Sequence, residues 1–537
     1  MRDYVSGEDL SEEDSYMVMF AAADDPVFFY EAVKDVKWRM AMDAEIDAIE
    51  RNDTWELTCL PTDAKKVGVK WVYKTKFNEN GGIDKHKARL VAKGYTQEHG
   101  IDYTEVFAPV ARMDTIRLVI SLAAQKQWMI FQLDVKSAFL HGDLSEDVFV
   151  EQPPGYEKKG NEHKVYKLKK ALYGLKQAPR AWYSRIESYF AKEGFEKCPY
   201  EHSLFIKTHE GGKLLIVCLY VDDLIFTGND EHMFTDFKKS MMHEFDMTDL
   251  GRMRYFLGIE VLQEQEGIFI HQRKYVNEVL QRFGMDKCNP VLNPIVPGSK
   301  LMQDTAGVKL DSSHYKQIVG SLMYLTTTRP DIMFVVSLLS RYMDHPTALH
   351  FEAAKRVLRY LKGTCEFGIF YSKRGEDKLI AYTDSDYAGD LNDRKSTSGY
   401  VFMFNSGAVS WSSKKQPIVT LSTTEAEFVA AAACACQVVW MRRIMGSLSL
   451  IQSDGTTVYC DNSSTIELSK NPVLHGRSKH IDIRFHFLRE LTKDGVVKMV
   501  HCNTQEQIAD IMTKPLKLDV FIKLRSLMGV CTFPGVN

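Results

Sequence analysis

Two adjacent aspartates, Asp222 and Asp223, stand in the stretch LYVDDLIFTG, whose other residues are typical of a buried strand. A buried carboxylate is costly unless it is paired, and two neighbouring carboxylates repel each other. The runs KLLIVCLY and LIFTG on either side predict a hairpin with the acidic pair at its turn. In isolation the pair is best explained as an ordinary acidic turn, because turns favour Asp. The chemical alternative is that both carboxylates face a cleft and bind a divalent cation.

A third carboxylate, Asp134, lies in the apolar run MIFQLDVKSAFLHGDL, just before a predicted turn. If this strand lies beside the hairpin of residues 219–226, three carboxylates converge at one sheet edge. Hard oxygen ligands of this kind select magnesium or manganese. Two such ions held close together can activate a hydroxyl group and stabilise a leaving pyrophosphate, which is the chemistry of nucleotidyl transfer.

A second set of carboxylates occurs near the C-terminus. KLIAYTDSDYAGD places Asp384 in a strand, and TTVYCDNSSTI places Asp461 at a strand end. Between them STTEAEF opens a helix in which Glu425 has capping-box spacing, so Glu427 is the better ligand candidate. TQEQIADIMTK predicts an amphipathic helix that carries Asp510, where an exposed aspartate would be ordinary.

The elements that would position these residues extend over several domains, since 537 residues are too many for one core. Helical spacing over residues 31–52 predicts a leading helix, and a mixed helix and strand region follows to about residue 262. Residues 286–314 are rich in Pro, Gly and Asp and are predicted to be a long loop. Helical patterns then precede strands that alternate with helices from about 376 to 515.

The composition is that of a globular protein, with 45% hydrophobic and 26% charged residues. The apolar stretch FVAAAACACQVVWM is shorter than a membrane span, and the chain does not open with a secretory signal. Ten cysteines without C-x-x-C pairs indicate reduced thiols in an intracellular compartment. We interpret Cys434 and Cys436 as part of a small-residue helix face rather than a metal site.

Charge is unevenly distributed, although the net charge is only -3. Residues 1–25 hold eight acidic groups and one basic group, whereas residues 64–95 hold nine basic groups and two acidic ones. Residues 164–185 carry seven Lys or Arg and no acid, and both basic segments contain Trp and Tyr. Basic segments with interleaved aromatics suit a polyanion whose bases can be stacked upon, although a solvated basic face alone would explain them as well.

The segment that carries Asp134, Asp222 and Asp223 resembles a known family. An apolar strand with Asp134, followed by a YVDD hairpin, is similar to a reverse transcriptase palm, and YVDD is one of that family's characteristic forms. The longer runs QLDVKSAFLHGDLSEDVFVEQPPGY and LKKALYGLKQAPRAWY resemble the Pol polyprotein of copia-type LTR retrotransposons. The resemblance implies that Asp134, Asp222 and Asp223 are catalytic and bind metal, with the backbone of Val135 near the ions.

The same resemblance implies roles for residues that contact the incoming nucleotide and the primer. Phe139 would be an aromatic gate that excludes a ribose 2′ hydroxyl, and Gln177 would lie beside the nucleotide. Arg89 and Lys87 would reach the nucleotide phosphates, although a surface salt bridge is an equal alternative for Arg89. Residues 255–261, YFLGIEV, would grip the primer end.

The C-terminal set resembles the ribonuclease H fold, in which four carboxylates hold two metal ions that direct water at an RNA phosphodiester. The resemblance assigns this role to Asp384, Glu427, Asp461 and Asp510, and TKPL after Asp510 is typical of copia-type elements. It covers nearly all of residues 30–516.

Other polar residues near this set are weaker ligand candidates. Asp386 ranks below Asp384, which matches the family motif, and Asp482 ranks lower because it begins a predicted helix. His475, His480 and His486 are interpreted as part of a basic loop near substrate, since no paired cysteines accompany them. His501 is a weak candidate for assisting product release.

The expected fold is a multidomain α+β chain with reverse transcriptase fingers, palm and thumb, then a helical tether and an α/β ribonuclease H-like domain. The expected segments are an acidic tail and leading helix (1–55), fingers and palm (56–262), thumb and connection helices with a linker (263–372), the ribonuclease H-like domain (373–516) and a C-terminal tail (517–537). Protease, zinc-knuckle and integrase signatures are absent from the sequence, so we expect the polymerase and nuclease portion of a Pol polyprotein.

The expected activity is RNA-directed DNA polymerisation with ribonuclease H activity in retrotransposon replication, with two Mg²⁺ or Mn²⁺ ions at each active site. The expected partners are an RNA template, a DNA primer, the RNA–DNA hybrid, dNTPs and integrase or other Pol segments, without a membrane. The expected location is intracellular, in cytoplasmic particles and the nucleus. The alternative is a catalytically silent remnant that only binds nucleic acid, and seven intact carboxylates argue against it.

Overall fold

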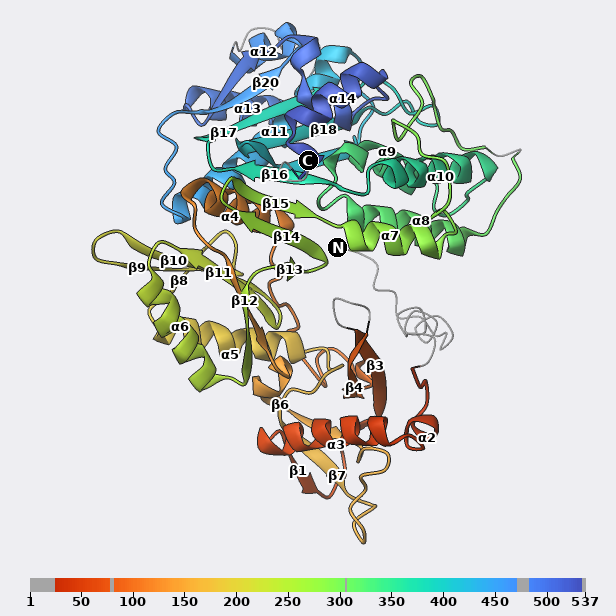
Figure 1. The fold of residues 1–537 in the computed structure, drawn as a ribbon, viewed down its shortest axis with the longest axis vertical. Coiled ribbons are helices and arrows are strands. Elements are labelled where there is room, and N and C mark those ends of the chain that lie inside the picture. Colours follow the sequence, from red (N-terminus) through yellow and green to blue (C-terminus); the bar gives the residue numbers. More distant parts are fainter. Residues whose placement is uncertain (1–24, 78–81, 305–306, 471–481, 534–537) are drawn as a thin grey trace.

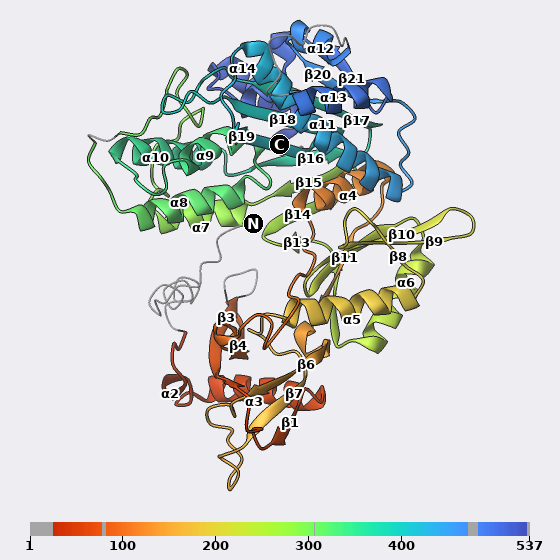
Figure 2. The same cartoon turned by 180° about the vertical axis from the view of Figure 1, so that it is seen from behind.

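The computed structural model describes residues 25–77, 82–304, 307–470 and 482–533. Along the long axis of the molecule, the N-terminal elements lie at one end, a six-stranded sheet lies in the middle and the C-terminal elements lie at the other end (Figures 1 and 2). The predicted acidic tail therefore lies outside the described residues, apart from Asp25, as do His475 and His480.

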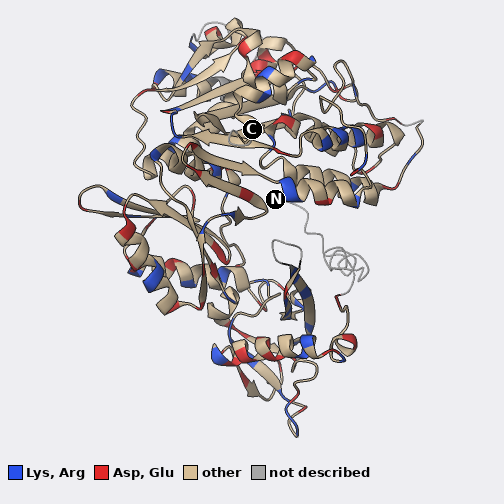
Figure 3. Cartoon of the chain, in the orientation of Figure 1, with Lys and Arg blue, Asp and Glu red and all other residues tan. Residues whose placement is uncertain are grey.

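The N-terminal elements surround a basic hairpin. Strands β3 (Val69–Phe77) and β4 (Ile83–Ala92) form this hairpin, which packs on helix α3 (Val36–Arg51). Four strands form a second, small sheet in the order β1-β7-β6-β2: Trp55–Thr58, Val165–Lys170, Asp143–Val150 and Lys66–Val67. Lysine and arginine residues are frequent along the β3–β4 hairpin (Figure 3), where the sequence predicts a basic surface.

The middle sheet, called the central sheet below, is entirely antiparallel. Its strands follow the order β12-β5-β11-β10-β9-β8: Met247–Arg252, Phe131–Val135, Asp223–Gly228, Lys213–Tyr220, Leu204–His209 and Glu196–Lys197. Alternation of side chains buries one face, with Val217 and Leu219, against helices α5 (Ala178–Lys192) and α6 (Glu231–Glu244). The other face, with Ile216 and Ile225, joins a larger core that continues into the C-terminal half.

A third sheet joins segments that are distant in sequence. Its strands follow the order β13-β14-β15-β16-β22: Tyr255–Phe256, Ile259–Glu264, Gly267–His271, Phe367–Ser372 and Val530–Thr532. Nearby helices are α4, α7, α8, α9, α10 and α14: Met113–Lys126, Arg273–Arg282, Ser312–Leu325, Met333–Ser340, Ala348–Gly363 and Leu518–Leu527. Residues 518–532, expected within a tail, thus form a helix with buried side chains and a strand of this sheet. The predicted domain boundaries remain predictions.

The C-terminal sheet has the order β19-β18-β17-β20-β21: Gly407–Lys415, Thr397–Asn405, Glu376–Ser385, Thr456–Cys460 and Val497–His501. Strands β17, β20 and β21 are parallel, so their carboxyl ends meet at one edge. Three helices pack around the sheet: α11 (Thr423–Ser447), α12 (Ser463–Lys470) and α13 (Asp482–Lys493).

Helix α11 is the one helix in the described part of the chain whose length and composition would allow it to cross a membrane. Within the fold, 61% of its most apolar window is buried, and the helix packs against β17. Its apolar composition therefore fits the role of a core helix.

The helix expected around Asp510 is present, but none of its residues is exposed, so the expected amphipathic character is wrong. Residues Ile508–Met512 form a short 3-10 helix, η7, in which all five residues are buried. It packs against β17 and β18, where the missing side chain of Gly399 makes room for the close approach of Met512. Asp510 is therefore a buried carboxylate and not an exposed one.

Candidate active sites

The predicted hairpin is present, and its turn is strained. Tyr220 pairs with Asp223 in register, which leaves Val221 and Asp222 as a two-residue turn between β10 and β11. Val221 has a φ of 55°, a conformation that a β-branched residue rarely adopts. A strained backbone of this kind persists only when surrounding contacts hold it in place.

Two hydrogen bonds hold this turn from two different elements. The indole Nε1 of Trp182, on α5, donates to the carbonyl of Val221 at 2.7 Å. The backbone N–H of Val135, at the end of β5, donates to the carbonyl of Asp222 at 2.9 Å. The backbone that carries Asp222 is thus fixed relative to both the helix and the neighbouring strand.

The third predicted carboxylate lies on the strand beside the hairpin. Strand β5 pairs with β11 so that Asp134 is directly opposite Asp223, and residues opposite each other share one face of a sheet. Burial, reinforced by Asp222 and Asp134, raises the pKa of Asp223 to about 6. Burial and the charge of Asp222 also raise the pKa of Asp134. The three carboxylates therefore repel one another, and a cation between them would be stabilising.

Two of the candidate nucleotide contacts, Arg89 and Phe139, lie beside the ring of Tyr173. The guanidinium of Arg89 lies 4.5 Å from the centre of that ring, and the ring of Phe139 lies 4.8 Å from it. Lys87 lies on the same strand as Arg89. Burial and the charge of Arg89 lower the pKa of its ammonium to about 8, although the charge of Asp134 acts to raise it. The structure therefore brings Lys87, Arg89 and Phe139 close to the carboxylate face, and their roles remain predictions.

Gln177 is held within the protein, and its nucleotide role remains a prediction. Its side chain is buried, its Nε2 donates to the carbonyl of Asp102 at 3.0 Å, and its Oε1 accepts from Gln97 at 3.1 Å. Both ends of the amide are thus used within the protein. Residues 255–261, the predicted primer grip, form β13, β14 and their turn, which the Tyr324 hydroxyl holds by donating to the carbonyl of Leu257 at 2.6 Å.

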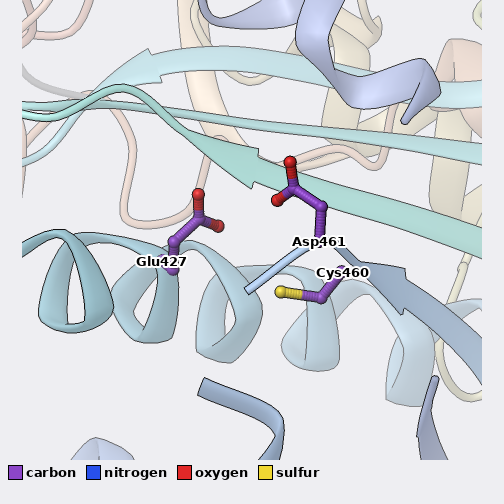
Figure 4. A group of neighbouring side chains, drawn as sticks. All are labelled: Glu427, Cys460 and Asp461. Atoms are coloured by element: carbon purple, nitrogen blue, oxygen red, sulfur yellow. The ribbon is translucent and has the colours of Figure 1, made fainter. Parts of the chain in front are cut away.

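The four C-terminal carboxylates meet at the carboxyl edge of the C-terminal sheet. Asp384 lies near the end of β17, Asp461 follows β20, Glu427 lies on α11 and Asp510 lies on η7. Carboxylate oxygens of Asp384, Asp461 and Asp510 all lie within 4.8 Å of one another. Asp461 also belongs to a second group of the same compactness, with Glu427 and the thiol of Cys460 (Figure 4).

The metal-free cluster is strongly repulsive. Burial, with the charges of Asp384 and Asp461, raises the pKa of Glu427 to about 10. Burial and Asp384 raise the pKa of Asp510 to about 7. Oε2 of Glu427 is buried and accepts no hydrogen bond. Oxygen donors that repel one another and include an unpartnered atom fit a hard divalent cation such as magnesium.

Lys514 is a member of the site that the sequence reasoning missed. Its ammonium nitrogen lies 2.9 Å from Asp510 Oδ1 and 3.6 Å from Asp384 Oδ2. The neighbouring Thr513 hydroxyl donates to Asp384 Oδ2. The TKPL motif contains both residues, but its sequence alone does not indicate that they reach the carboxylates.

The remaining candidates lie outside the compact carboxylate groups. Glu425 has the predicted capping role, since its Oε2 accepts from the N–H of Leu421 at 2.7 Å. Asp386 accepts from the N–H of Thr397, and burial raises its pKa to about 6. His486 on α13 and His501 at the end of β21 are exposed. The side chain of Asp482 lies outside the described residues.

Comparison with known proteins identifies the family. A model of the reverse transcriptase (RNA-dependent DNA polymerase) family matches residues 52–297. The retrovirus-related Pol polyprotein from transposon RE1 of Arabidopsis thaliana is 41% identical over 97% of this chain and 36% of its own length. The corresponding polyprotein from transposon TNT 1-94 of Nicotiana tabacum is 40% identical over 91% of this chain and 37% of its own length.

A shorter relative is covered almost completely. The transposon Ty5-1 protein of Saccharomyces cerevisiae is 33% identical over 56% of this chain and 98% of its own length. The chain belongs to the copia-type retrotransposon Pol polyproteins. It spans about a third of the length of the larger Pol relatives. The mixed helix and sheet architecture is that expected for a copia-type reverse transcriptase followed by a ribonuclease H-like domain.

Among solved structures, a foamy viral protease-reverse transcriptase in complex with dsDNA aligns with 88% of this copia-type chain and 84% of its own, at 13% identity and a TM-score of 0.46.

Proposed function

We propose that the chain is an RNA-directed DNA polymerase that also has ribonuclease H activity, and that each site uses two magnesium or manganese ions. The observation that carries the polymerase proposal is the register that sets Asp134 opposite Asp223, next to the rigidly held turn with Asp222. This geometry stands within the segment that matches the reverse transcriptase family. Divalent ions bound there would supply charge neutralisation for attack of a primer hydroxyl on a nucleotide phosphate.

The chain's own residues support a triphosphate substrate next to these carboxylates. Lys87 and Arg89 bring positive charge from β4 toward the face that carries Asp134, as a dNTP would require. Phe139, packed on Tyr173, would limit the room beside the sugar. The basic residues of the β3–β4 hairpin suit a template that is held by its phosphate backbone.

The second half of the proposal rests on the C-terminal cluster. Asp384, Glu427, Asp461 and Asp510 would hold the ions, and Lys514 would keep positive charge beside them for the phosphodiester of an RNA–DNA hybrid. The proposed partners are an RNA template, a DNA primer, dNTPs and integrase or other Pol segments, in cytoplasmic particles and the nucleus.

Primer extension on an RNA template in the presence of magnesium tests the polymerase proposal. Wild type should extend the primer, and Asp222→Asn should abolish extension. Asp236→Asn, an exposed carboxylate on α6, should have no effect. Absence of extension by a folded wild-type chain that still binds hybrid would favour the silent remnant.

Cleavage of RNA in a hybrid tests the nuclease proposal separately. Asp461→Asn should abolish cleavage and leave primer extension in place. The exposed Asp454→Asn is the matched control and should retain both activities. Cleavage that survives in Asp461→Asn would remove this cluster from the proposed mechanism.

A further inference from the structure

The group Glu427, Cys460 and Asp461 shares Asp461 with the group of Asp384, Asp461 and Asp510, but it contains a thiol sulfur where that group has only carboxylate oxygens. Cys460 precedes Asp461 at the end of β20, and its side chain is fully buried. Its sulfur and the carboxylate oxygens of Glu427 and Asp461 all lie within 4.8 Å of one another. Figure 4 shows the sulfur turned toward α11, below the two carboxylates.

A second observation points to a bound ligand at this group, because one of its buried donor atoms has no partner. Glu427 is only 6% exposed, and its Oε2 has no hydrogen-bond partner. Figure 4 shows that its carboxylate faces Asp461 across the group. A buried carboxylate oxygen without a partner is costly, so a cation bound to it would be stabilising.

The donor set favours a particular class of cation. Magnesium prefers oxygen ligands, whereas zinc and cadmium take thiolate together with carboxylate. Three protein donors are enough for a zinc site when a water molecule supplies the fourth ligand, and Asp461 is half-buried rather than fully buried.

We propose that Glu427, Cys460 and Asp461 form a binding site for a thiophilic divalent cation, with Zn²⁺ as the cation expected in cells. As the metal–sulfur bond forms, the thiol proton leaves to solvent, so the bound sulfur is a thiolate. Because Asp461 belongs to both groups, zinc bound here withdraws it from the group with Asp384 and Asp510. The consequence for activity, which rests on the proposed nuclease function, is that zinc inhibits magnesium-dependent hybrid cleavage.

Titration of the full chain with CdCl₂, without nucleic acid or magnesium, tests the binding. The readouts are the ultraviolet thiolate-to-cadmium charge-transfer band and calorimetric affinity. Wild type should show a band that Cys460→Ser lacks, whereas Cys59→Ser, which removes an exposed thiol, should retain it. Glu427→Gln keeps the thiol but removes a ligand, so it should weaken cadmium binding by about tenfold or more, since even the loss of an outer-shell partner costs that much at metal sites.

The outcomes separate this proposal from the proposed nuclease function. An identical cadmium band and affinity in wild type and in a folded Cys460→Ser would overturn the site and leave Cys460 as a core thiol. If Cys460→Ser does not fold, an unchanged affinity in Glu427→Gln overturns it instead. A chain that binds cadmium through Cys460 yet cleaves no hybrid keeps the site and loses only the inhibition. In an active chain, zinc should inhibit cleavage by wild type more strongly than cleavage by Cys460→Ser.

Discussion

The indole N–H of Trp182 donates to the carbonyl of Val221, so a buried side chain of α5 holds the strained turn that carries Asp222. Replacing Trp182 with Phe removes the donor but keeps an aromatic ring in the core. We expect the stability of the chain to fall by about 1 kcal/mol, since the half-buried carbonyl of Val221 loses its partner. Primer extension should fall further than this loss of folded protein explains, while hybrid cleavage by the folded fraction remains.

Trp440→Phe is the matched control for this prediction. The indole of Trp440 also donates to a backbone carbonyl, that of Tyr200, at 3.2 Å. This hydrogen bond does not involve the turn residues Val221 and Asp222. Thermal melting and both activity assays should show little change in this variant. Equal loss of extension in both variants would mean that the turn does not depend on Trp182.

The positions of the strand-end carboxylates could be predicted from local pattern alone. Asp134, Asp384 and Asp461 each interrupt or end an apolar run, and local patterning places such residues at the edge of a sheet. The pairing of Asp134 with Asp223 needed the family resemblance, because residues separated by the whole of α5, β9 and β10 meet only through tertiary structure.

Three features could not be predicted, each because it depends on packing between distant segments. Asp510 is buried since η7 lies against β17 and β18, whereas its local sequence reads as an exposed helix. Lys514 joins the cluster only because η7 carries it to Asp384. The amide of Gln177 forms hydrogen bonds with Gln97 and Asp102. A contact between separate segments of this kind cannot be predicted from sequence periodicity.

Lys514 is expected to compete with metal for the carboxylates. Lys514→Met removes a positive charge between Asp384 and Asp510. Because this ion pair is partly exposed, the metal-free chain should lose only about 1–2 kcal/mol of stability. Without the competing ammonium, magnesium should bind more tightly. The magnesium concentration that gives half of the increase in melting temperature should fall roughly tenfold, which corresponds to about 1.4 kcal/mol of relieved repulsion. EDTA-treated protein provides the metal-free baseline.

The exposed Lys517→Met is the control for this measurement, and its magnesium response should match that of wild type. A weaker magnesium response in Lys514→Met would contradict the competition and indicate that the ammonium supports the bound ion.

The raised pKa of Glu427 predicts how the stability of the metal-free chain depends on pH. The folded chain keeps a proton that the unfolded chain releases near pH 4.5, and it does so up to about pH 10. Because the folded state then binds more protons, stability falls as the pH rises through this window. Between about pH 5 and 8 the loss should be about 1 kcal/mol or more, and saturating magnesium should offset it.

Glu427→Gln is neutral at every pH and should flatten this dependence. Urea unfolding of EDTA-treated wild type and variant at several pH values measures the difference. Parallel curves for the two proteins would mean that Glu427 is already ionised in the metal-free fold.

A buried ion pair in the connecting region yields the last prediction. Arg329 and Asp331 are almost fully buried and form two hydrogen bonds, Nε to Oδ1 at 3.0 Å and Nη2 to Oδ2 at 2.8 Å. The hydroxyl of Tyr360, on α10, donates to Asp331 at 2.6 Å and accepts from Arg525 of α14 at 2.9 Å. This network therefore joins the loop before α9 to the C-terminal helix.

Asp331→Ala leaves the Arg329 charge buried without its carboxylate, and should destabilise the chain by about 3–5 kcal/mol. Tyr360→Phe keeps the ion pair and removes one hydroxyl, so its cost should be only about 1–2 kcal/mol. The double substitution Arg329→Met with Asp331→Ala should cost less than the sum of its single changes, because no unpaired charge remains. Urea unfolding of wild type, Arg329→Met, Asp331→Ala and the double variant measures this coupling. Additive costs would show that solvent reaches Arg329 once Asp331 is removed.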